Sequence, residues 1–316
     1  MEENKDSHPV IKNPLLEELL RPQRIVFIVN PKAGVNIQRR IRTSVEQHLN
    51  HRRFEYGIWH TEFAGHGTQL AQKAIAEQYD IVVAVGGDGS INEIASALIG
   101  TDVTLGILPA GSGNGLATHL GYGRNLDQAV KKINLAETRV IDSGALNGRP
   151  FFNVAGIGFD GLVSNLMRKQ QKRGLLPYFL KSLEAGLTYT SRECAIEMDG
   201  QVVTEKCFVV AVANGPMYGY NFQIAPDAQL DDGLFNVVLL KDAPRWHYFA
   251  ALPATLNGSL YDASFVEHFQ AKKVTIRCAG ENHVHLDGEG MIISDELHFD
   301  MKPRSLKILV PRAAKA

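Results

Sequence analysis

The chain has 316 residues, of which 45% are hydrophobic and 21% charged, and its 33 basic and 34 acidic residues leave a net charge of −1. This composition is typical of a globular protein with an apolar core, which excludes global disorder, and the balanced charge disfavours nucleic acid as a partner. The length exceeds that of an average domain, so we expect two domains, with one long domain as the alternative.

The three cysteines, Cys194, Cys207 and Cys278, show no C-x-x-C spacing and are odd in number. They therefore predict neither a disulfide framework nor a cysteine zinc site, and they favour a reducing compartment. The apolar runs fall far short of the ~20 residues of a membrane-spanning helix. Because the N-terminus is acidic and polar, unlike a secretory signal, we expect a cytoplasmic protein whose residues 1–23 form a mobile leader.

From Ile25 onward, short apolar runs alternate with segments of helical periodicity. This alternation predicts a doubly wound parallel sheet over residues 24–140. The expected strands and helices, in chain order, are 25–29, 36–49 (helix), 54–59, 67–79 (helix), 81–85, 91–98 (helix), 103–108 and 126–134 (helix).

After about residue 140 the pattern changes. Turn dipeptides at 147–148 and 199–200 lie between strand-like runs, which is typical of antiparallel hairpins. We therefore expect a mostly antiparallel, β-sandwich-like second domain over residues 141–302, with residues 303–316 returning to the first domain.

Two helical segments, near 161–190 and 244–260, are expected to interrupt the second domain. In the later one, apolar residues from Trp246 to Tyr261 recur at helical spacing, and we expect them to pack in the core, with the wall of a ligand cleft as the alternative.

Each of four strands in the first half runs into a small, polar loop, at 30–34, 61–68, 86–90 and 109–115. In an open parallel sheet these loops share the carboxyl edge, where such folds bind ligands. Glycine lets backbone N–H groups approach an anion, and a helix N-terminus behind the loop favours negative charge. The sequence therefore predicts a site for a phosphate chain at this edge.

The loop at 86–90 is neither a Walker A loop nor a G-x-G-x-x-G dinucleotide fingerprint. Ser90 could cap the following helix, with Glu93 as its capping-box partner. Taken alone, this loop and the one at 111–115 could each be a tight turn between a strand and a helix.

Three motifs together carry a family resemblance: Asn-Pro-x-x-Gly at 30–34, Gly-Gly-Asp-Gly-Ser-x-Asn-Glu at 86–93 and Leu-Pro-x-Gly-Ser-Gly-Asn at 108–114. In this order they resemble the catalytic domain of the diacylglycerol kinase and sphingosine kinase family, over roughly residues 24–312. The resemblance implies an α/β domain like those of phosphofructokinase and NAD kinases, a β-sandwich-like second domain, and a cleft between them where ATP and a lipid meet.

The resemblance and the glycine-rich loops together imply a set of nucleotide contacts. They are Asn30, Thr61, Gly86, Gly87, Gly89, Ser90, Glu93, Gly111, Ser112 and Asn114.

The resemblance also implies catalytic carboxylates. Glu289 is favoured as the base that takes the proton from the lipid hydroxyl, and Asp88 is the alternative. Asp142 and Asp287 would belong to a water-linked network around the catalytic magnesium. On extended backbone Asp287 and Glu289 would face the same side, although Asp287-Gly288 alone is typical of a hairpin turn.

The acidic turn at 231–233 is by default a surface turn. The resemblance implies that Asp232 helps to hold a structural magnesium there, together with backbone carbonyls near Gln229 and Leu234.

The basic run at 168–173 either forms a solvated helix face or attracts an anionic group, namely a phosphate or an anionic membrane. The resemblance implies that Asp160 receives the lipid head, and that Arg168 and Arg173 assist substrate binding. We expect the histidines at 283 and 285 to be solvated strand residues rather than metal ligands.

The sequence thus predicts an ATP- and Mg²⁺-dependent kinase that phosphorylates a hydroxyl of diacylglycerol, a sphingoid base or a related lipid. The run at 114–117, Asn-Gly-Leu-Ala, is closer to sphingosine and ceramide kinases and leans towards a sphingoid substrate. We expect peripheral association with the membrane, and the chain could also form a homodimer.

Two rival functions remain at this point. An NAD kinase shares the Gly-Gly-Asp-Gly loop, but here Asn92-Glu93 follows the loop at once, as in lipid kinases. A non-catalytic nucleotide- or lipid-binding protein would have no physical reason to hold so many carboxylates beside bound phosphate.

Overall fold

A computed structural model describes residues 21–34, 36–111, 113–168, 186, 188–294 and 296–312. Most of the expected leader, together with Ser112, Arg173 and the side chain of Arg168, lies outside the described residues.

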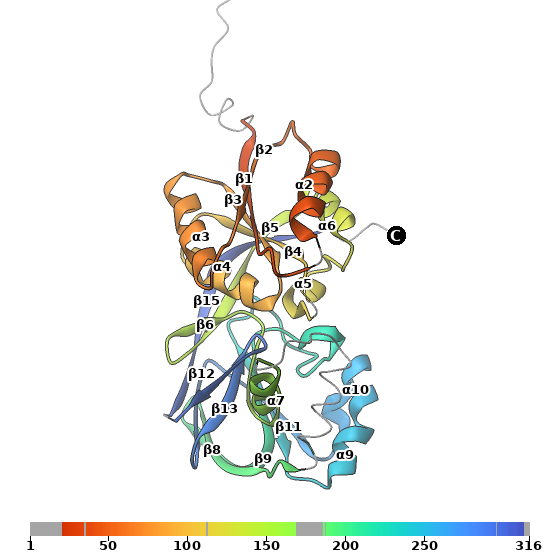
Figure 1. Cartoon of the computed structure of the whole chain (residues 1–316). Coiled ribbons are helices and arrows are strands. Elements are labelled where there is room, and N and C mark those ends of the chain that lie inside the picture. Colours follow the sequence, from red (N-terminus) through yellow and green to blue (C-terminus); the bar gives the residue numbers. More distant parts are fainter. Residues whose placement is uncertain are drawn as a thin grey trace, which may run out of the picture.

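The first half of the chain forms a parallel sheet in the order β2-β1-β3-β4. Helices α3 and α4 cover one face of this sheet, and α2 and α6 cover the other (Figure 1). Because both faces are covered, every residue of β3 and β4 is buried, as continuous apolar strands require. The prediction of a doubly wound α/β fold is confirmed. The elements are β1 (Gln23–Val29), α2 (Ile37–His48), β2 (Phe54–His60), α3 (His66–Ala76), β3 (Ile81–Gly86), α4 (Asp88–Leu98), β4 (Thr104–Pro109), α5 (Gly115–His119) and α6 (Leu126–Ile133).

The second half is mostly antiparallel, with strand order β14-β13-β7-β9-β8-β12-β15, and β10 and β11 extend it beside β9. Both expected hairpins are present, and all four residues of the two turns have positive φ, as two-residue turns of type I′ require. The strands are β5 (Glu137–Leu146), β6 (Arg149–Phe151), β7 (Val154–Gly158), β8 (Arg192–Met198), β9 (Gln201–Ala213), β10 (Phe235–Lys241), β11 (Val266–Ala271), β12 (Lys273–Cys278), β13 (Asn282–Leu286), β14 (Glu289–Ile293) and β15 (Leu297–Val310). The helical segments are α7 (Phe159–Arg168), η1 (Gly219–Asn221), α9 (Arg245–Ala250), α10 (Leu252–Asn257) and η2 (Leu260–Asp262).

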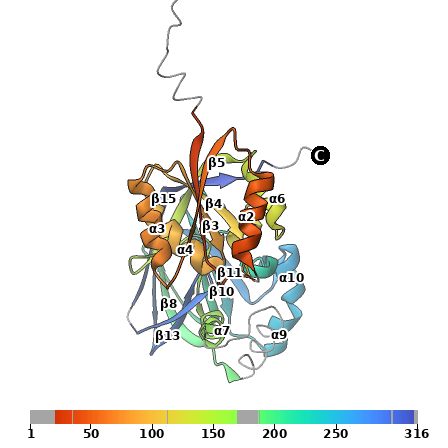
Figure 2. The same ribbon diagram turned by 45° about the horizontal axis from the view of Figure 1, so that its top comes forward.

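Strands β5 and β15 pair with each other and run from one half of the molecule into the other (Figure 2). At its start β15 contributes Leu297 and Phe299 to the core of the β-rich half. At its end it contributes Leu306 and Ile308 to the core of the α/β half, where Ile308 pairs with Leu105 of β4. The two halves therefore share a continuous pair of strands.

The prediction that Trp246 to Tyr261 packs in the core is wrong for α9 and α10, since neither helix buries a residue. The Trp246 side chain is 64% exposed and Leu256 is 52% exposed. It is Tyr248, on the other side of α9, that stacks on Phe208 of the core, with ring centroids 4.1 Å apart. Helical spacing located an apolar face but could not tell whether anything covers it.

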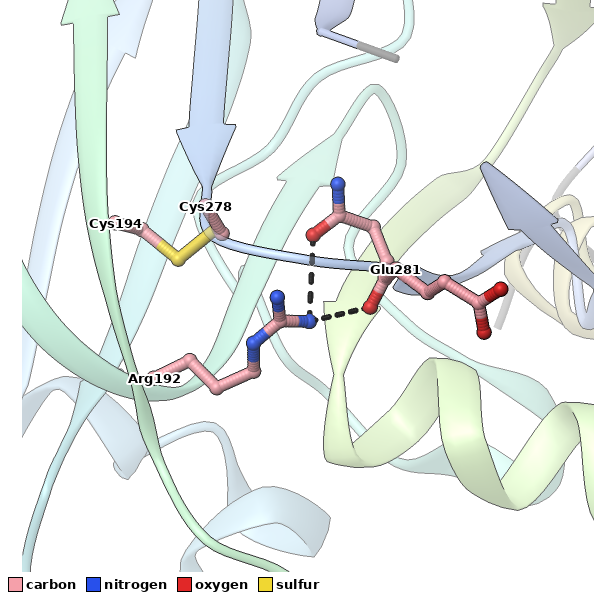
Figure 3. Close-up of a disulfide and its surroundings, with 5 residues drawn as sticks. Arg192, Cys194, Cys278 and Glu281 are labelled. Carbon is pink, nitrogen blue, oxygen red and sulfur yellow. Dashed lines mark hydrogen bonds between the residues drawn. A yellow bond between two sulfur atoms is a disulfide. The ribbon is translucent and has the colours of Figure 1, made fainter. Parts of the chain in front are cut away.

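The prediction that the cysteines form no disulfide is also wrong. Cys194 on β8 and Cys278 on β12 are direct partners of an antiparallel pair and form a disulfide, with Cα atoms 4.3 Å apart (Figure 3). Nearby, Arg192 donates to the backbone oxygen of Glu281, which directly precedes β13. Cys207 is a buried free thiol. An odd number of cysteines therefore does not exclude a single pair whose partners meet through strand pairing.

In the part of the chain that the structure describes, we find no helix that combines the length and the apolar character needed to cross a bilayer.

Candidate functional site

A cavity of about 860 Å³ lies at the carboxyl edge of the parallel sheet, where the loops after β1, β2, β3 and β4 meet. Its other wall comes from the second half of the chain, namely from Ser164 and Met167 of α7 and from residues 287–290 at the β13–β14 turn. Ten of the predicted site residues line it: Asn30, Thr61, Gly87, Asp88, Gly89, Ser90, Glu93, Gly111, Asp287 and Glu289.

The N-terminus of α4 opens into this cavity. Its N-cap is Gly87, so the prediction of Ser90 as the N-cap is wrong. Ser90 lies within the first turn, where its Oγ accepts a hydrogen bond of 2.8 Å from Asn30 Nδ2. A Cβ at Gly86 would come within 2.6 Å of the Ser90 Cβ, so the glycine allows the strand to enter the helix directly.

Glu93 caps a different helix from the one predicted. Its Oε1 accepts from the backbone N–H of Gly67 at 2.6 Å and of Thr68 at 3.2 Å, in the first turn of α3. The Thr68 hydroxyl in turn donates to the Glu93 backbone oxygen. Because the N-cap of α3, Gly65, has no side chain, Glu93 supplies the missing acceptor from α4 and fixes the two helices together.

Asp88 anchors the second glycine-rich loop. Its carboxylate accepts from the backbone N–H of Asn114 at 2.8 Å and of Gly115 at 3.0 Å. Burial raises the pKa of Asp88 to about 6, and the nearby charge of Asp287 adds to the shift. Asn114 itself is buried and does not line the cavity, because its N–H is turned to Asp88.

Asp287 lies in the tight turn between β13 and β14 with φ of 49°, so the expectation of an extended backbone through this residue is wrong. Its carboxylate accepts from Asn92 Nδ2 at 2.8 Å and from three backbone N–H groups, those of residues 152–154, at 2.9–3.2 Å. Burial nevertheless raises the pKa of Asp287. Glu289, the first residue of β14, is exposed at the cavity.

Asp142 does not lie at the cavity with the other carboxylates. It is fully buried, and its two oxygens accept from the backbone N–H of Gly233 at 2.7 Å and of Arg304 at 2.6 Å. Asp232 is exposed nearby, and its Oδ1 accepts from the N–H of Leu234 at 3.0 Å. Desolvation and the neighbouring Asp142 raise the pKa of Asp232. Among the described residues, no group of three or more His, Cys, Asp or Glu is placed to hold a metal ion.

The prediction of a solvated histidine at 285 is wrong. The His285 side chain is 3% exposed, and its Nε2 lies 3.2 Å from Asp160 Oδ2. Asp160 also accepts from the Tyr218 hydroxyl at 2.7 Å and does not line the cavity. Gly86 likewise lies behind the cavity wall.

Several residues that line the cavity are not among the predicted site residues. Asn92, which belongs to the motif at 86–93, donates to Asp287 and orients it. Lys32, in the motif at 30–34, lines the cavity and is exposed. Glu62 and Phe63 lie in the loop after β2, which was expected at the ligand-binding edge although neither residue was predicted as a contact.

The lining is strongly acidic. Among the described lining residues, Lys32 is the single lysine or arginine, against five carboxylates: Glu62, Asp88, Glu93, Asp287 and Glu289. Such a lining repels a bare polyphosphate, and hard divalent cations prefer its carboxylate oxygens. The composition of the described lining therefore favours an anion whose charge a metal ion neutralises.

Two family models match the chain. A diacylglycerol kinase catalytic domain matches residues 24–146, and a YegS C-terminal NAD kinase beta sandwich-like domain matches residues 153–310. Two crystal structures of Bacillus anthracis str. Sterne proteins share the fold. One superimposes with a TM-score of 0.77 at 24% identity, covering 93% of this chain and 97% of that chain. The other, a diacylglycerol kinase, has a TM-score of 0.69 at 22% identity and covers 93% and 98%.

Curated relatives extend the likeness along the sequence. Diacylglycerol kinase of Bacillus subtilis (strain 168) is 30% identical over 297 residues, which cover 92% of this chain and 97% of the relative. Diacylglycerol kinase of Staphylococcus carnosus (strain TM300) is 27% identical over 273 residues, covering 84% and 89%. With both domain models matched in order and a relative this similar over nearly its whole length, the chain belongs to the lipid kinase family that carries the diacylglycerol kinase catalytic domain.

Proposed function

We propose that this protein transfers the γ-phosphoryl group of ATP to a hydroxyl of diacylglycerol or a related lipid, with Mg²⁺, at the surface of a membrane. The observation that carries the proposal is the acidic cavity at the N-terminus of α4, whose described lining holds five carboxylates and one lysine. The helix terminus favours the phosphates, and the carboxylates favour the metal ion that neutralises them. The names of the relatives direct the choice of substrate towards diacylglycerol ahead of a sphingoid base.

Glu289 is the better candidate for the base. It is exposed at the cavity, so a substrate hydroxyl can reach its carboxylate. Asp88 instead uses both carboxylate oxygens to accept backbone N–H groups, which suits it to hold the loop and the local charge. Phosphoryl transfer needs alignment and charge neutralisation above all, so a positioned acceptor for the hydroxyl proton completes the site.

The carboxylates of the cavity are hard oxygen donors and fit a magnesium ion that keeps several waters. Bound there, the ion would neutralise charge on the phosphates. A second, structural magnesium at Asp232, with the carbonyls of Gln229 and Leu234, stays part of the proposal. It would have to share Asp232 with the N–H of Leu234.

The test is transfer of labelled γ-phosphate from ATP to dioleoylglycerol, sphingosine and ceramide in mixed micelles and to NAD in solution, with and without Mg²⁺. We expect labelled phosphatidate with Mg²⁺, an activity that Glu289→Gln lowers by at least about a hundredfold while ATP binding persists. The matched control is Glu281→Gln, an exposed glutamate outside the cavity lining.

Each other outcome has a definite meaning. Labelled NAD in place of lipid would replace the proposal with a soluble-substrate kinase. Full activity of Glu289→Gln would remove that residue from the base role. ATP binding without any labelled product would favour a binding protein.

A further inference from the structure

A buried polar connection lies between the start of α7 and the turn that carries Asp287 and Glu289. His285 Nε2 lies 3.2 Å from Asp160 Oδ2, and the two side chains are 3% and 11% exposed. On the other side of the ring, His285 Nδ1 accepts from the backbone N–H of Gly288 at 3.2 Å. Gly288 is the second residue of the turn, directly before Glu289.

These two contacts determine where the proton on the ring lies. A nitrogen that accepts a hydrogen bond from an N–H group carries no proton itself, so Nδ1 is unprotonated. The proton of the neutral ring is then on Nε2 and is donated to the Asp160 carboxylate. His285 thus joins an acidic group on α7 to the backbone of the turn through one defined tautomer.

The same carboxylate reaches the other wall of the site. Asp160 Oδ2 also accepts from the Tyr218 hydroxyl at 2.7 Å. The next residue, Gly219, packs so closely on the glycine-rich loop that a Cβ there would lie 2.7 Å from the Gly113 Cα. The connection therefore extends from the loop that Asp88 holds to the turn that carries Glu289.

The surrounding backbone leaves room for this pair and for little else. Gly156 of β7 is the strand partner of His285, and a Cβ at Gly156 would overlap both the Asp160 carboxylate and the His285 ring. Gly290 of β14 packs on the backbone of α7, where a Cβ would lie 2.5 Å from the Asn165 nitrogen. Glycines on both sides thus let α7 approach the β13–β14 hairpin closely.

We infer that His285 is a positioning residue for Glu289. Asp160 holds the ring through the Nε2–H group, and Nδ1 accepts from the Gly288 N–H. This contact fixes the turn and thereby the position of Glu289 at the cavity. The inference rests on the proposed function in so far as Glu289 acts on the substrate hydroxyl. It assigns Asp160 to this buried pair, where the resemblance had implied a contact with the lipid head.

The first test needs no substrate. Histidine labelled with ¹⁵N in the wild-type protein, assigned by comparison with His285→Asn, reports the tautomer of His285 directly. We expect the neutral Nε2–H tautomer. A ring protonated on Nδ1 would overturn the inference, whether or not the protein phosphorylates lipids.

The second test separates the two contacts of the ring. In His285→Asn the side-chain oxygen can take the place of Nδ1 and accept from Gly288, whereas in His285→Gln the amide nitrogen can take the place of Nε2 and donate to Asp160. We expect kcat for the lipid to fall about tenfold in His285→Gln and to stay within about threefold of wild type in His285→Asn, with KM for ATP unchanged in both.

Equal kcat values in the two variants, or a lower value in His285→Asn, would contradict the positioning role. When His285→Gln is added to Glu289→Gln, kcat should not fall further, because the effect of His285 on kcat passes through Glu289. If the wild-type protein transfers no phosphate to any lipid while His285 has the Nε2–H tautomer, the proposed function fails. The contacts of His285 with Asp160 and Gly288 are then still supported.

Discussion

Gly111 and Gly89 both line the cavity, but a side chain at each position would meet different surroundings. A Cβ at Gly111 would lie 2.5 Å from the Gly87 Cα, so the two glycine-rich loops pack backbone against backbone. A Cβ at Gly89, in the first turn of α4, would meet nothing within 4 Å. Gly111 is therefore required for the close packing of the two loops. Gly89 instead keeps space open in the cavity.

We expect Gly111→Ala to lower the free energy of unfolding by about 1–3 kcal/mol, because the loops must separate. Gly89→Ala should leave stability unchanged or raise it by up to about 1 kcal/mol, since alanine favours helix, but it should raise KM for ATP severalfold. Urea unfolding and initial rates measure the two effects. Equal stability of the two variants would contradict the packing argument.

Asp88 makes a testable contribution to the pH dependence of stability. Its pKa rises from 3.8 to about 6 on folding, chiefly through burial. The folded protein therefore binds this proton more tightly than the unfolded chain, so the carboxyl lowers stability as the pH rises from about 4 through 6.

Asp88→Asn removes this titration. The free energy of unfolding of the variant minus that of wild type should therefore be larger, meaning a relatively more stable variant, at about pH 7.5 than at about pH 4.5. Asp231→Asn, which alters an exposed carboxyl, serves as the control. The same difference at both pH values would mean that folding does not shift the pKa of Asp88.

At the scale of elements, helix α3 depends on a carboxylate from its neighbour. Glu93 of α4 accepts two N–H groups in the first turn of α3, whose own N-cap is a glycine. We expect Glu93→Ala to lower the free energy of unfolding by about 1 kcal/mol and Glu93→Gln, which keeps an acceptor oxygen, to cost clearly less. Glu62→Ala, another carboxylate of the cavity, should have no such effect in urea unfolding. A similar loss in all three variants would argue against the cap.

The strands and helices of the first half could be predicted because their signals are local. Strands such as β3 are short, continuously apolar and bounded by polar loops, as burial on both faces requires. The exposed face of α9 could not be predicted, because an apolar face looks the same in the sequence whether or not another element covers it. Cys194 and Cys278 are 84 residues apart and become partners only when β8 and β12 align.

The candidate site could be predicted to a similar extent. Motifs placed Asp88 and Gly111 together because the ends of parallel strands share an edge. The second wall, from Asp287 and Glu289, followed only from the family resemblance. The buried pair of Asp160 and His285 depends on how α7 packs on the β13–β14 hairpin, and this packing of distant segments leaves no local pattern in the sequence.

At the scale of the whole molecule, shared strands β5 and β15 should make the two halves unfold together. The chain has two tryptophans, Trp59 on β2 in the α/β half and Trp246 on α9 in the β-rich half. Each half can therefore be followed separately by fluorescence in the variants Trp246→Phe and Trp59→Phe.

We expect the two single-tryptophan variants to unfold in urea at the same midpoint. Ile308→Ala, which removes a fully buried side chain from the α/β core, should lower both midpoints together, at a cost of about 2–5 kcal/mol. Lys302→Ala, at an exposed position of the same strand, should leave both unchanged. A shift of the Trp59 signal alone would mean that the halves unfold independently.

The path of β15 also bears on how the protein is synthesised. While a nascent chain lacks residues 306–309, β4 has no partner at its outer edge and the core of the first half lacks Leu306, Ile308 and Leu309. An uncovered strand edge can pair with other chains, so the emerging first half is exposed to misassembly for as long as the β-rich half is being translated. The α/β half, although made first, is thus completed last.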